Sequence, residues 1–233
     1  VWSRPFFLIN NKVSITQDTR FLKENPRLAE KKETCYNDFQ KNTGAGRNKK
    51  MSRLGIFFAD GCEEIEGLAV VDIIRRAKMD ITTISITGKK EVTGSHQITF
   101  LTDALFEDVD FSELDGIILP GGMPGTLNLG AHAGVTAQVK AFAEAGKLVC
   151  AICAAPSVLG ACGILNGKKA TCHPGFEEKL TGASVSYDNV VTDGNVITSR
   201  GMGTVIDFGL AIVSYFGSEE LVEDVRKHLV YNR

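Results

Sequence analysis

The sequence predicts an α/β protein whose mostly parallel sheet is covered by helices on both faces. From residue 51 onward, short apolar segments alternate with helical patterns, as is typical of parallel strands joined by crossover helices. The segment LVCAICAAP at residues 148–156 leads an apolar strand into Cys153, two alanines and a proline. This order is typical of a nucleophile elbow, a sharp strand-to-helix turn that exposes one reactive side chain.

Periodicity and end signals predict the individual strands and helices. Residues 53–59 predict a buried strand, and 64–78 predict an amphipathic helix that packs through Ile65 and Leu68. Strands are then expected at 81–86, 116–119 and 148–152, with a hairpin or short strands at 92–101. A second hairpin at 189–192 and 196–199 surrounds Asp193-Gly194-Asn195. The remaining helices are expected at 135–145, 156–162, 204–216 and 219–228.

Composition indicates one globular domain with a basic extension. The chain has 233 residues, 43% hydrophobic and 23% charged, which fits a single core-forming domain. Residues 1–50 hold 11 Lys/Arg and 5 Asp/Glu (+6), while 51–233 hold 15 and 23 (−8). We expect 1–50 to be a disordered extension or an upstream artefact, with the functional domain at 51–233.

Charge and cysteine content narrow the classes of partner and compartment. An acidic domain is poorly suited to sequence-independent nucleic-acid binding, and no apolar run approaches the ~20 residues that span a bilayer. Six cysteines in a chain of this length do not indicate a disulfide framework. A reducing cytoplasm is therefore the expected compartment.

Three loops with unusual residues follow predicted strands, at 60–66, 120–126 and 153–156. Ligand chemistry in parallel sheets gathers at the carboxyl ends of the strands, so we expect these loops to converge. Cys153 would be the nucleophile, because the following helix directs N–H groups and its positive dipole end at the sulfur and favours thiolate. The alternative is a buried structural cysteine.

Four further residues complete the predicted site. A desolvated Glu66 beside a thiolate would be protonated, and could donate a hydrogen bond and shuttle a proton; the alternative is favourable charge at a helix N-terminus. Gly122 and Ala154 would offer amides to an oxyanion, although Gly122 alternatively serves a turn at positive φ. His173 is the histidine most compatible with a site, with a structural role as its alternative.

Two other readings of the cysteines are disfavoured. Cys150 and Cys153 form a C-x-x-C pair, but three residues along a strand separate their Cα atoms by roughly 10 Å, too far for a disulfide. A zinc site lacks the paired ligand spacing of structural sites, so no metal is expected.

Five ordered motifs carry a family resemblance: EEIE at 63–66, LPGG at 119–122, AICAAP at 151–156, HP at 173–174 and TSRG at 198–201. They resemble the ThiJ/PfpI superfamily, most closely the branch of the parkinsonism-associated deglycase and bacterial YajL-type proteins. The resemblance spans 51–233 and implies a flavodoxin-like three-layer sandwich, a homodimer and no cofactor. It also implies Cys153 as reactive cysteine, Glu66 as protonated glutamate, His173 nearby, and Gly122 and Ala154 as oxyanion amides.

The chain departs from the superfamily pattern at three positions. Ala155 stands where glycine is common, which would narrow the pocket, and Met202 stands where proline often occurs. Ala154 stands where the peptidase-like branch has histidine, so a Cys-His protease triad is not supported.

The resemblance implies a cysteine-dependent, cofactor-independent glyoxalase or deglycase that protects against carbonyl and oxidative stress. Its partners would be methylglyoxal, a small aldehyde, or early adducts of it on protein or nucleotide amines. No specific nucleic-acid sequence and no membrane are expected as partners. The alternative is a redox-sensing thiol protein or chaperone whose Cys153 is oxidised to sulfinate.

Overall fold

The structure is a computed structural model that describes residues 52–232. The extension expected over residues 1–50 lies outside the described residues. None of the helices described between residues 52 and 232 is long and apolar enough to cross a membrane.

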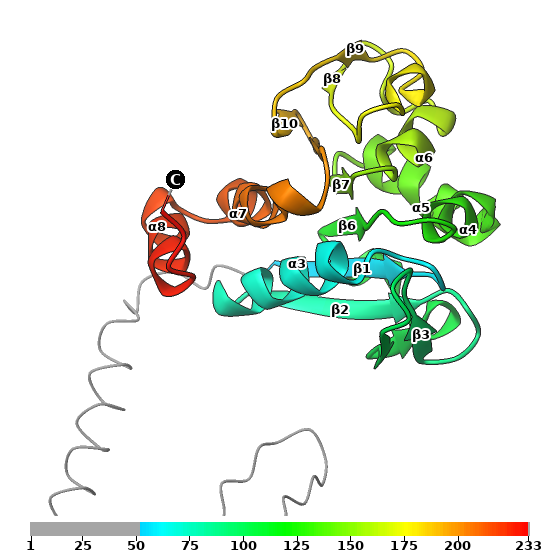
Figure 1. Cartoon of the computed structure of the whole chain (residues 1–233), viewed down its shortest axis with the longest axis horizontal. Helices are drawn as coiled ribbons and strands as arrows, with labels where there is room; N and C mark the ends of the chain where they lie inside the picture. The colour runs from blue at the N-terminus through cyan, green and yellow to red at the C-terminus, as the bar shows by residue number, and fades with distance from the viewer. Residues whose placement is uncertain (1–51, 233) are drawn as a thin grey trace, which may run out of the picture. The chain divides into compact units, whose positions relative to one another are not determined.

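A seven-stranded sheet forms the centre of the domain, in the order β10-β11-β7-β6-β1-β2-β5 (Figure 1). Its strands are β1 (Arg53–Phe58), β2 (Asp80–Ser85), β5 (Ala104–Leu105), β6 (Gly116–Leu119), β7 (Leu148–Ile152), β10 (Val190–Asp193) and β11 (Val196–Ser199). All neighbours pair in parallel except β10 and β11. Without the two edge strands, the order is that of a flavodoxin-like sheet.

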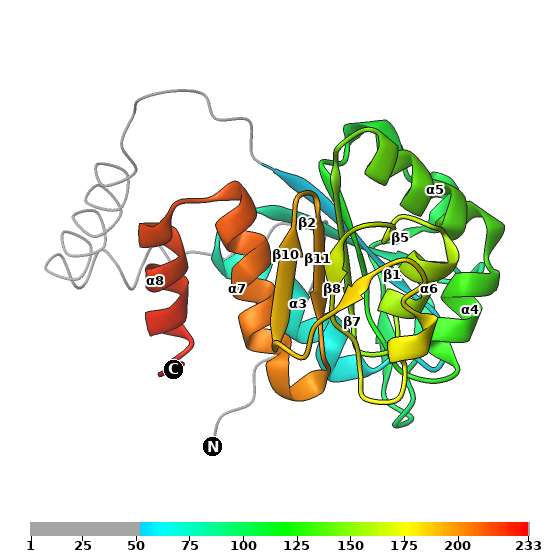
Figure 2. The same cartoon turned by 90° about the horizontal axis from the view of Figure 1, so that it is seen from above.

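Helices cover both faces of this sheet, as predicted. One layer holds α3 (Glu64–Arg76), α7 (Val205–Phe216) and α8 (Glu219–His228), and the other holds α4 (Gly125–Ala131), α5 (Ala133–Glu144) and α6 (Pro156–Ala161). Figure 2 shows α7 and α8 on one side of the sheet and α4, α5 and α6 on the other. The side chains of strand β7 alternate between two hydrophobic cores, one on each face of the sheet. Cys150 and Ile152 lie in the core under α3 and α7, whereas Val149 and Ala151 lie in the core under α5. The flavodoxin-like three-layer sandwich is confirmed.

Two small sheets and four short 3-10 turns complete the fold. The hairpin expected within 92–101 is present as β3 (Glu91–Thr93) and β4 (Thr99–Leu101). A second pair, β8 (Lys169–Ala170) and β9 (Ser184–Val185), is parallel. The turns are Phe106–Asp108, Phe111–Glu113, Glu177–Lys179 and Met202–Thr204.

The predicted packing face of α3 is wrong. Ile65 is 50% exposed and Leu68 is 37% exposed, whereas the opposite side of the helix is buried. Gly67 lies so close to the Phe58 ring of β1 that a Cβ at this position would overlap it. The buried side is formed by Gly67, Val70, Val71, Ile73 and Ile74, and the close approach at Gly67 is possible only on that side. Glu66 is consequently turned inward and is 1% exposed.

Candidate active site

Four loops meet at the carboxyl edge of the sheet. The loops after β6 and β7 carry Gly121 and Cys153, and the loop after β1 leads into the first turn of α3, which carries Glu66. The convergence of these three segments was predicted. The loop after β11 joins them, since the Cys153 N–H donates to the Ser199 carbonyl oxygen over 2.9 Å. The sequence analysis included the TSRG motif at 198–201 in the family resemblance but did not place it among the converging loops.

Cys153 stands on a strained elbow between β7 and α6. Its φ is +64°, a left-handed conformation that costs a residue other than glycine about 1–2 kcal/mol. Two main-chain hydrogen bonds hold the turn: the one to Ser199, and one from the His173 N–H to the Cys153 carbonyl oxygen over 2.8 Å. The side chain is half-buried, so the elbow presents the sulfur at the edge of the sheet, with Pro156 at the first turn of α6.

Glu66 lies directly against Cys153. The Gly121 N–H donates to Glu66 Oε2 over 3.0 Å, and the Met202 N–H and the Cys153 thiol also donate to this carboxylate. A Cβ at Gly121 would lie 2.6 Å from both Cys153 Cβ and Glu66 Oε2. Only glycine therefore leaves room for the two reactive groups to touch.

Burial and proximity perturb both groups. Burial raises the pKa of Glu66 to about 7, although the hydrogen bonds from Cys153, Gly121 and Met202 lower it. Burial, followed by the Glu66 carboxylate, raises the pKa of the Cys153 thiol to about 12. Two neighbouring negative charges are unfavourable in a desolvated site, so above about pH 7 the pair holds one shared proton and one charge. The expectation of a Cys153 thiolate beside a protonated Glu66 stays a prediction; in the structure burial and the Glu66 carboxylate raise the pKa of the thiol, which opposes the effect of the helix dipole.

The predicted oxyanion amides face the sulfur. The N–H groups of Ala154 and Gly122 donate to Cys153 and oppose the rise in its pKa. Gly122 has a φ of +88°, and a Cβ there would overlap the Glu63 amide. Its glycine character is thus required by backbone geometry, and the same geometry aims its N–H at the reactive atom.

His173 lies at the rim of the site. Its backbone bonds the elbow, but its Nδ1 is 2.9 Å from the Pro174 carbonyl oxygen and its ring meets Phe176 edge-on. A Cβ at Gly201 would lie 3.6 Å from His173 Cδ2 and 3.9 Å from Glu66 Oε1. His173 is therefore a near neighbour of the pair, and its ring makes no hydrogen bond to either member in the described part of the chain.

The structure shows what Ala155 and Met202, two of the departures from the superfamily pattern, do at the site. Ala155 is fully buried in the core under α5, so its methyl group does not narrow the opening at Cys153. Met202 contributes a main-chain donor to Glu66, which sequence reasoning missed. Proline has no N–H, so the departure from proline at this position was the signal that could have found it.

One group of side chains between residues 52 and 232 has metal-binding geometry. The ligand atoms of Glu63, Glu64 and His96 lie within 4.8 Å of one another. Glu64 accepts hydrogen bonds from the His96 N–H at 2.8 Å and from the Ile98 N–H at 3.4 Å. These bonds anchor the β3–β4 hairpin to the start of α3, which accounts for the group without an ion.

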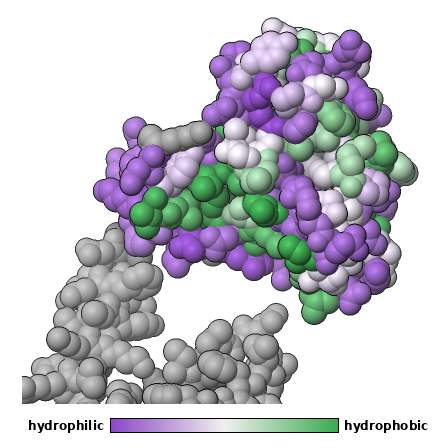
Figure 3. All heavy atoms as spheres, viewed as in Figure 1, coloured by the Kyte–Doolittle hydropathy of each residue, from purple (hydrophilic) through white to green (hydrophobic). Residues whose placement is uncertain are grey.

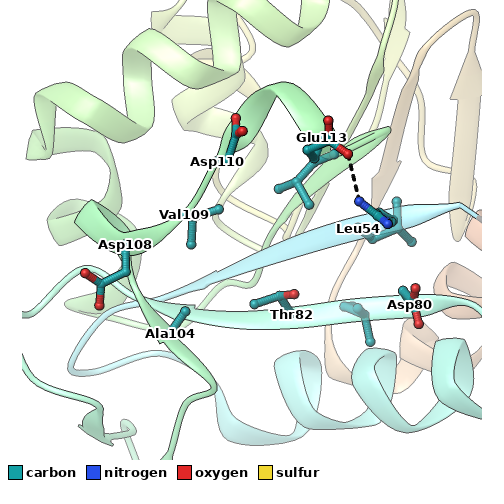
Figure 4. A pocket seen from close by; sticks show the side chains of 11 residues that line it. Leu54, Asp80, Thr82, Ala104, Asp108, Val109, Asp110 and Glu113 are labelled. Carbon is teal, nitrogen blue, oxygen red and sulfur yellow. Dashed lines mark hydrogen bonds and ion pairs between the residues drawn. The ribbon is translucent and has the colours of Figure 1, made fainter.

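A cavity of about 510 Å³ lies at the other end of the sheet. Leu54, Asp80 and Thr82 line it near the amino ends of β1 and β2, and the Arg53–Glu113 ion pair closes one side (Figure 4). Its eleven lining residues include no cysteine or histidine. The groups able to react are thus at the carboxyl edge rather than in this cavity.

The profile of the DJ-1/PfpI family matches residues 52–215. The chain belongs to this family. Over 163 residues it is 39% identical to Protein DJ-1 homolog B of Arabidopsis thaliana, covering 70% of this chain and 37% of that protein. The chain thus matches well under half the length of this plant relative.

Two further relatives are similar over nearly their full lengths. The Glutathione-independent glyoxalase DJR-1.2 of Caenorhabditis elegans is 33% identical over 172 residues, covering 73% of this chain and 91% of that protein. The crystal structure of Drosophila melanogaster DJ-1beta superposes with a TM-score of 0.76 at 34% identity, covering 78% of this chain and 100% of that one. The described domain therefore corresponds to a complete DJ-1 fold.

Proposed function

We propose that this protein is a cysteine-dependent, cofactor-independent glyoxalase that also acts on early methylglyoxal adducts of protein or nucleotide amines. The proposal rests on the direct contact of Cys153 and Glu66 at Gly121, beneath the amides of Gly122 and Ala154. A nucleophile, a proton carrier and an oxyanion site are thereby within contact of one another. The similarity to a relative named as a glutathione-independent glyoxalase supports this choice of reaction.

The chemistry follows from these positions. Transfer of the shared proton to Glu66 leaves a thiolate, whose lone pair attacks the aldehyde carbon of methylglyoxal. The former carbonyl electrons move onto oxygen, where the two amides stabilise the charge until Glu66 donates its proton and gives a hemithioacetal. The resulting Glu66 carboxylate removes the proton from the former aldehyde carbon and returns it to the neighbouring carbon, while the hydroxyl proton moves from the oxygen of the first carbon to that of the second. The thioester so formed reacts with water, which releases lactate and restores the thiol.

The test is lactate formation from methylglyoxal by the full chain without glutathione. We expect turnover in the wild-type protein, none in Cys153→Ser, and a loss of about 10²-fold or more in Glu66→Gln, which cannot accept a proton. Turnover that survives in Cys153→Ser would overturn the cysteine mechanism. Folding of each variant is checked by its thermal transition.

A second function is favoured by the same contact. If peroxide oxidises Cys153, a sulfinate oxygen can accept hydrogen bonds from Glu66 and from the Gly122 amide, so we propose redox sensing, with or without chaperone activity, as the alternative. Peptide mass analysis after mild peroxide should place two oxygens on Cys153 before any on Cys62 or Cys172, which are buried. Earlier oxidation of either buried cysteine would refute it.

We further propose that two copies of the chain associate through the surface of α3. Figure 3 shows apolar residues gathered on the face that carries α3 and α7, and Ile65 and Leu68 are exposed there. Self-association covers such a surface in two-fold dimers, and the superfamily resemblance implies a homodimer. Light scattering should give twice the chain mass of 25.2 kDa, and Ile65→Glu should halve it, whereas Val230→Glu on the exposed C-terminal end should not.

A further inference from the structure

Arg200 differs from the other described arginines in having no acidic partner. Between residues 52 and 232 there are five arginines, and four of them form ion pairs at 3.1 Å or less: Arg53 with Glu113, Arg75 with Asp103, Arg76 with Asp72, and Arg226 with Glu223. Arg200 forms none within 4.0 Å in this part of the chain, although it is only half-exposed. A partly desolvated guanidinium without a carboxylate has unused donors for a planar anion.

The main chain at Arg200 borders the site. The preceding residue, Ser199, accepts the hydrogen bond from the Cys153 amide. The following residue, Gly201, lies beside both His173 and Glu66. Arg200 is therefore fixed by the same loop that completes the elbow, rather than by an independent surface segment.

The surroundings of the guanidinium restrict its direction. It stands over the Tyr187 ring, 5.6 Å from the centroid, and Tyr187 is 71% exposed. The carboxylate of Glu177, which interacts with the Arg200 charge, is held by the Gly175 N–H at 2.7 Å. The pKa of Glu177 is lowered first by hydrogen bonds to its carboxylate from its own N–H and the Gly175 N–H, and then by Arg200 and His173. These three side chains therefore lie together on one rim.

We propose that Arg200, stacked on Tyr187, forms an anion subsite that selects 2-oxoaldehydes bearing a carboxylate or phosphate group. This inference rests on the proposed glyoxalase function for its substrate, but the subsite itself is independent of turnover. The aldehyde would face Cys153 while the anionic end is held at the rim. Methylglyoxal, which has no anionic end, would use the reactive pair without using Arg200.

The subsite is tested by the alkylation of Cys153 with a charged and an uncharged reagent. We expect the ratio of the rate constants for iodoacetate and iodoacetamide to fall by roughly fivefold or more in Arg200→Gln, with Arg200→Lys intermediate. A folding defect lowers both rates and leaves the ratio unmoved. The matched control Arg76→Gln removes an equal charge from the exposed surface of α3 and should leave the ratio at the wild-type value; an unmoved ratio in Arg200→Gln overturns the subsite.

Turnover and competition separate the remaining outcomes. At constant ionic strength, slowing of iodoacetate alkylation by inorganic phosphate indicates a phosphate-bearing substrate, and slowing by acetate alone indicates a carboxylate. The wild type should prefer 4,5-dioxopentanoate to its methyl ester in kcat/KM, and Arg200→Gln should lose this preference. If the alkylation ratio changes in Arg200→Gln but no 2-oxoaldehyde is converted, the anion subsite stands and the glyoxalase proposal fails. If methylglyoxal is converted but Arg200→Gln changes neither the alkylation ratio nor the preference for 4,5-dioxopentanoate over its ester, the glyoxalase proposal stands and the subsite fails.

Discussion

Replacing Met202 by proline should raise the pH at which the enzyme becomes active. Met202 is the first residue of a 3-10 turn, where the fixed φ of proline is accommodated. The preceding Gly201 has φ 162° and ψ −170°, an extended conformation that suits a residue before proline. The substitution therefore deletes one N–H donor to Glu66 and leaves the backbone path unchanged.

The size of the effect follows from the loss of a hydrogen bond to a charged group, which is worth ~1.5–3 kcal/mol. The pKa of Glu66, about 7 in the wild type, should therefore rise, but by less than such a bond is worth in full, because the Met202 amide lowers it less than the Cys153 thiol and the Gly121 amide do. The sign follows because the donor stabilises the charged form, so its removal favours the protonated form. At pH 7 the fraction of protein in the singly charged state then falls by up to ~5-fold, while the plateau at high pH is retained.

The assay is kcat/KM for methylglyoxal between pH 5.5 and 9.5, accompanied by the pH dependence of Cys153 alkylation with iodoacetamide. The alkylation profile reports the same ionisation without requiring turnover. Met202→Leu is the matched control, because it keeps the amide and a similar side-chain volume, and should reproduce the wild-type profile. Superposition of the Met202→Pro and wild-type profiles would refute the role of this amide.

Three further predictions concern stability and packing. Because burial raises the pKa of Glu66 from 4.5 to about 7, the folded state retains a proton that the unfolded state loses, so the free energy of unfolding falls as pH rises through this window. Glu66→Gln removes this dependence, so its free energy of unfolding should gain ~3 kcal/mol relative to wild type between pH 4.5 and 8; an equal difference between the two proteins at both pH values would contradict this. Gly121→Ala, whose Cβ would lie 2.6 Å from Cys153 Cβ, should abolish turnover and slow alkylation by at least ~10²-fold, whereas Gly203→Ala, with nothing within 4 Å, should behave as wild type. Cys153→Gly should have a free energy of unfolding ~1–2 kcal/mol higher than Cys153→Ala, because φ at residue 153 is +64° and glycine adopts this conformation without strain. The opposite order of stability would mean that the elbow is not strained.

Apolar continuity and end signals were sufficient to predict the main strands and their layers. β6, β7, β11 and α8 begin and end at the expected residues, because buried parallel strands and capped helices leave strong local patterns. The two-residue strands β5, β8 and β9 and the glycine-rich helix α4 were not predicted. Each is too short or too weakly patterned for local sequence to specify, and tertiary pairing determines it.

The site was predictable where side chains carry the chemistry and not where the backbone does. Cys153 and Glu66 could be identified as residue types placed after strands, although the inward turn of Glu66 depends on Gly67 packing against Phe58 rather than on the predicted face. The amides of Gly121 and Met202 could not be identified in this way, since every residue except proline has an N–H. Their direction depends on how distant loops fold together.

The elbow at residue 153 has a consequence for inactive forms of the protein. The main-chain hydrogen bonds to Ser199 and from His173 fix this turn without any contribution from the thiol. Loss of the sulfur should therefore leave an intact binding surface that still captures ligand and releases it unchanged. Such forms would persist as folded decoys, compete with active copies for the same molecules, and serve as traps from which bound substrates can be identified.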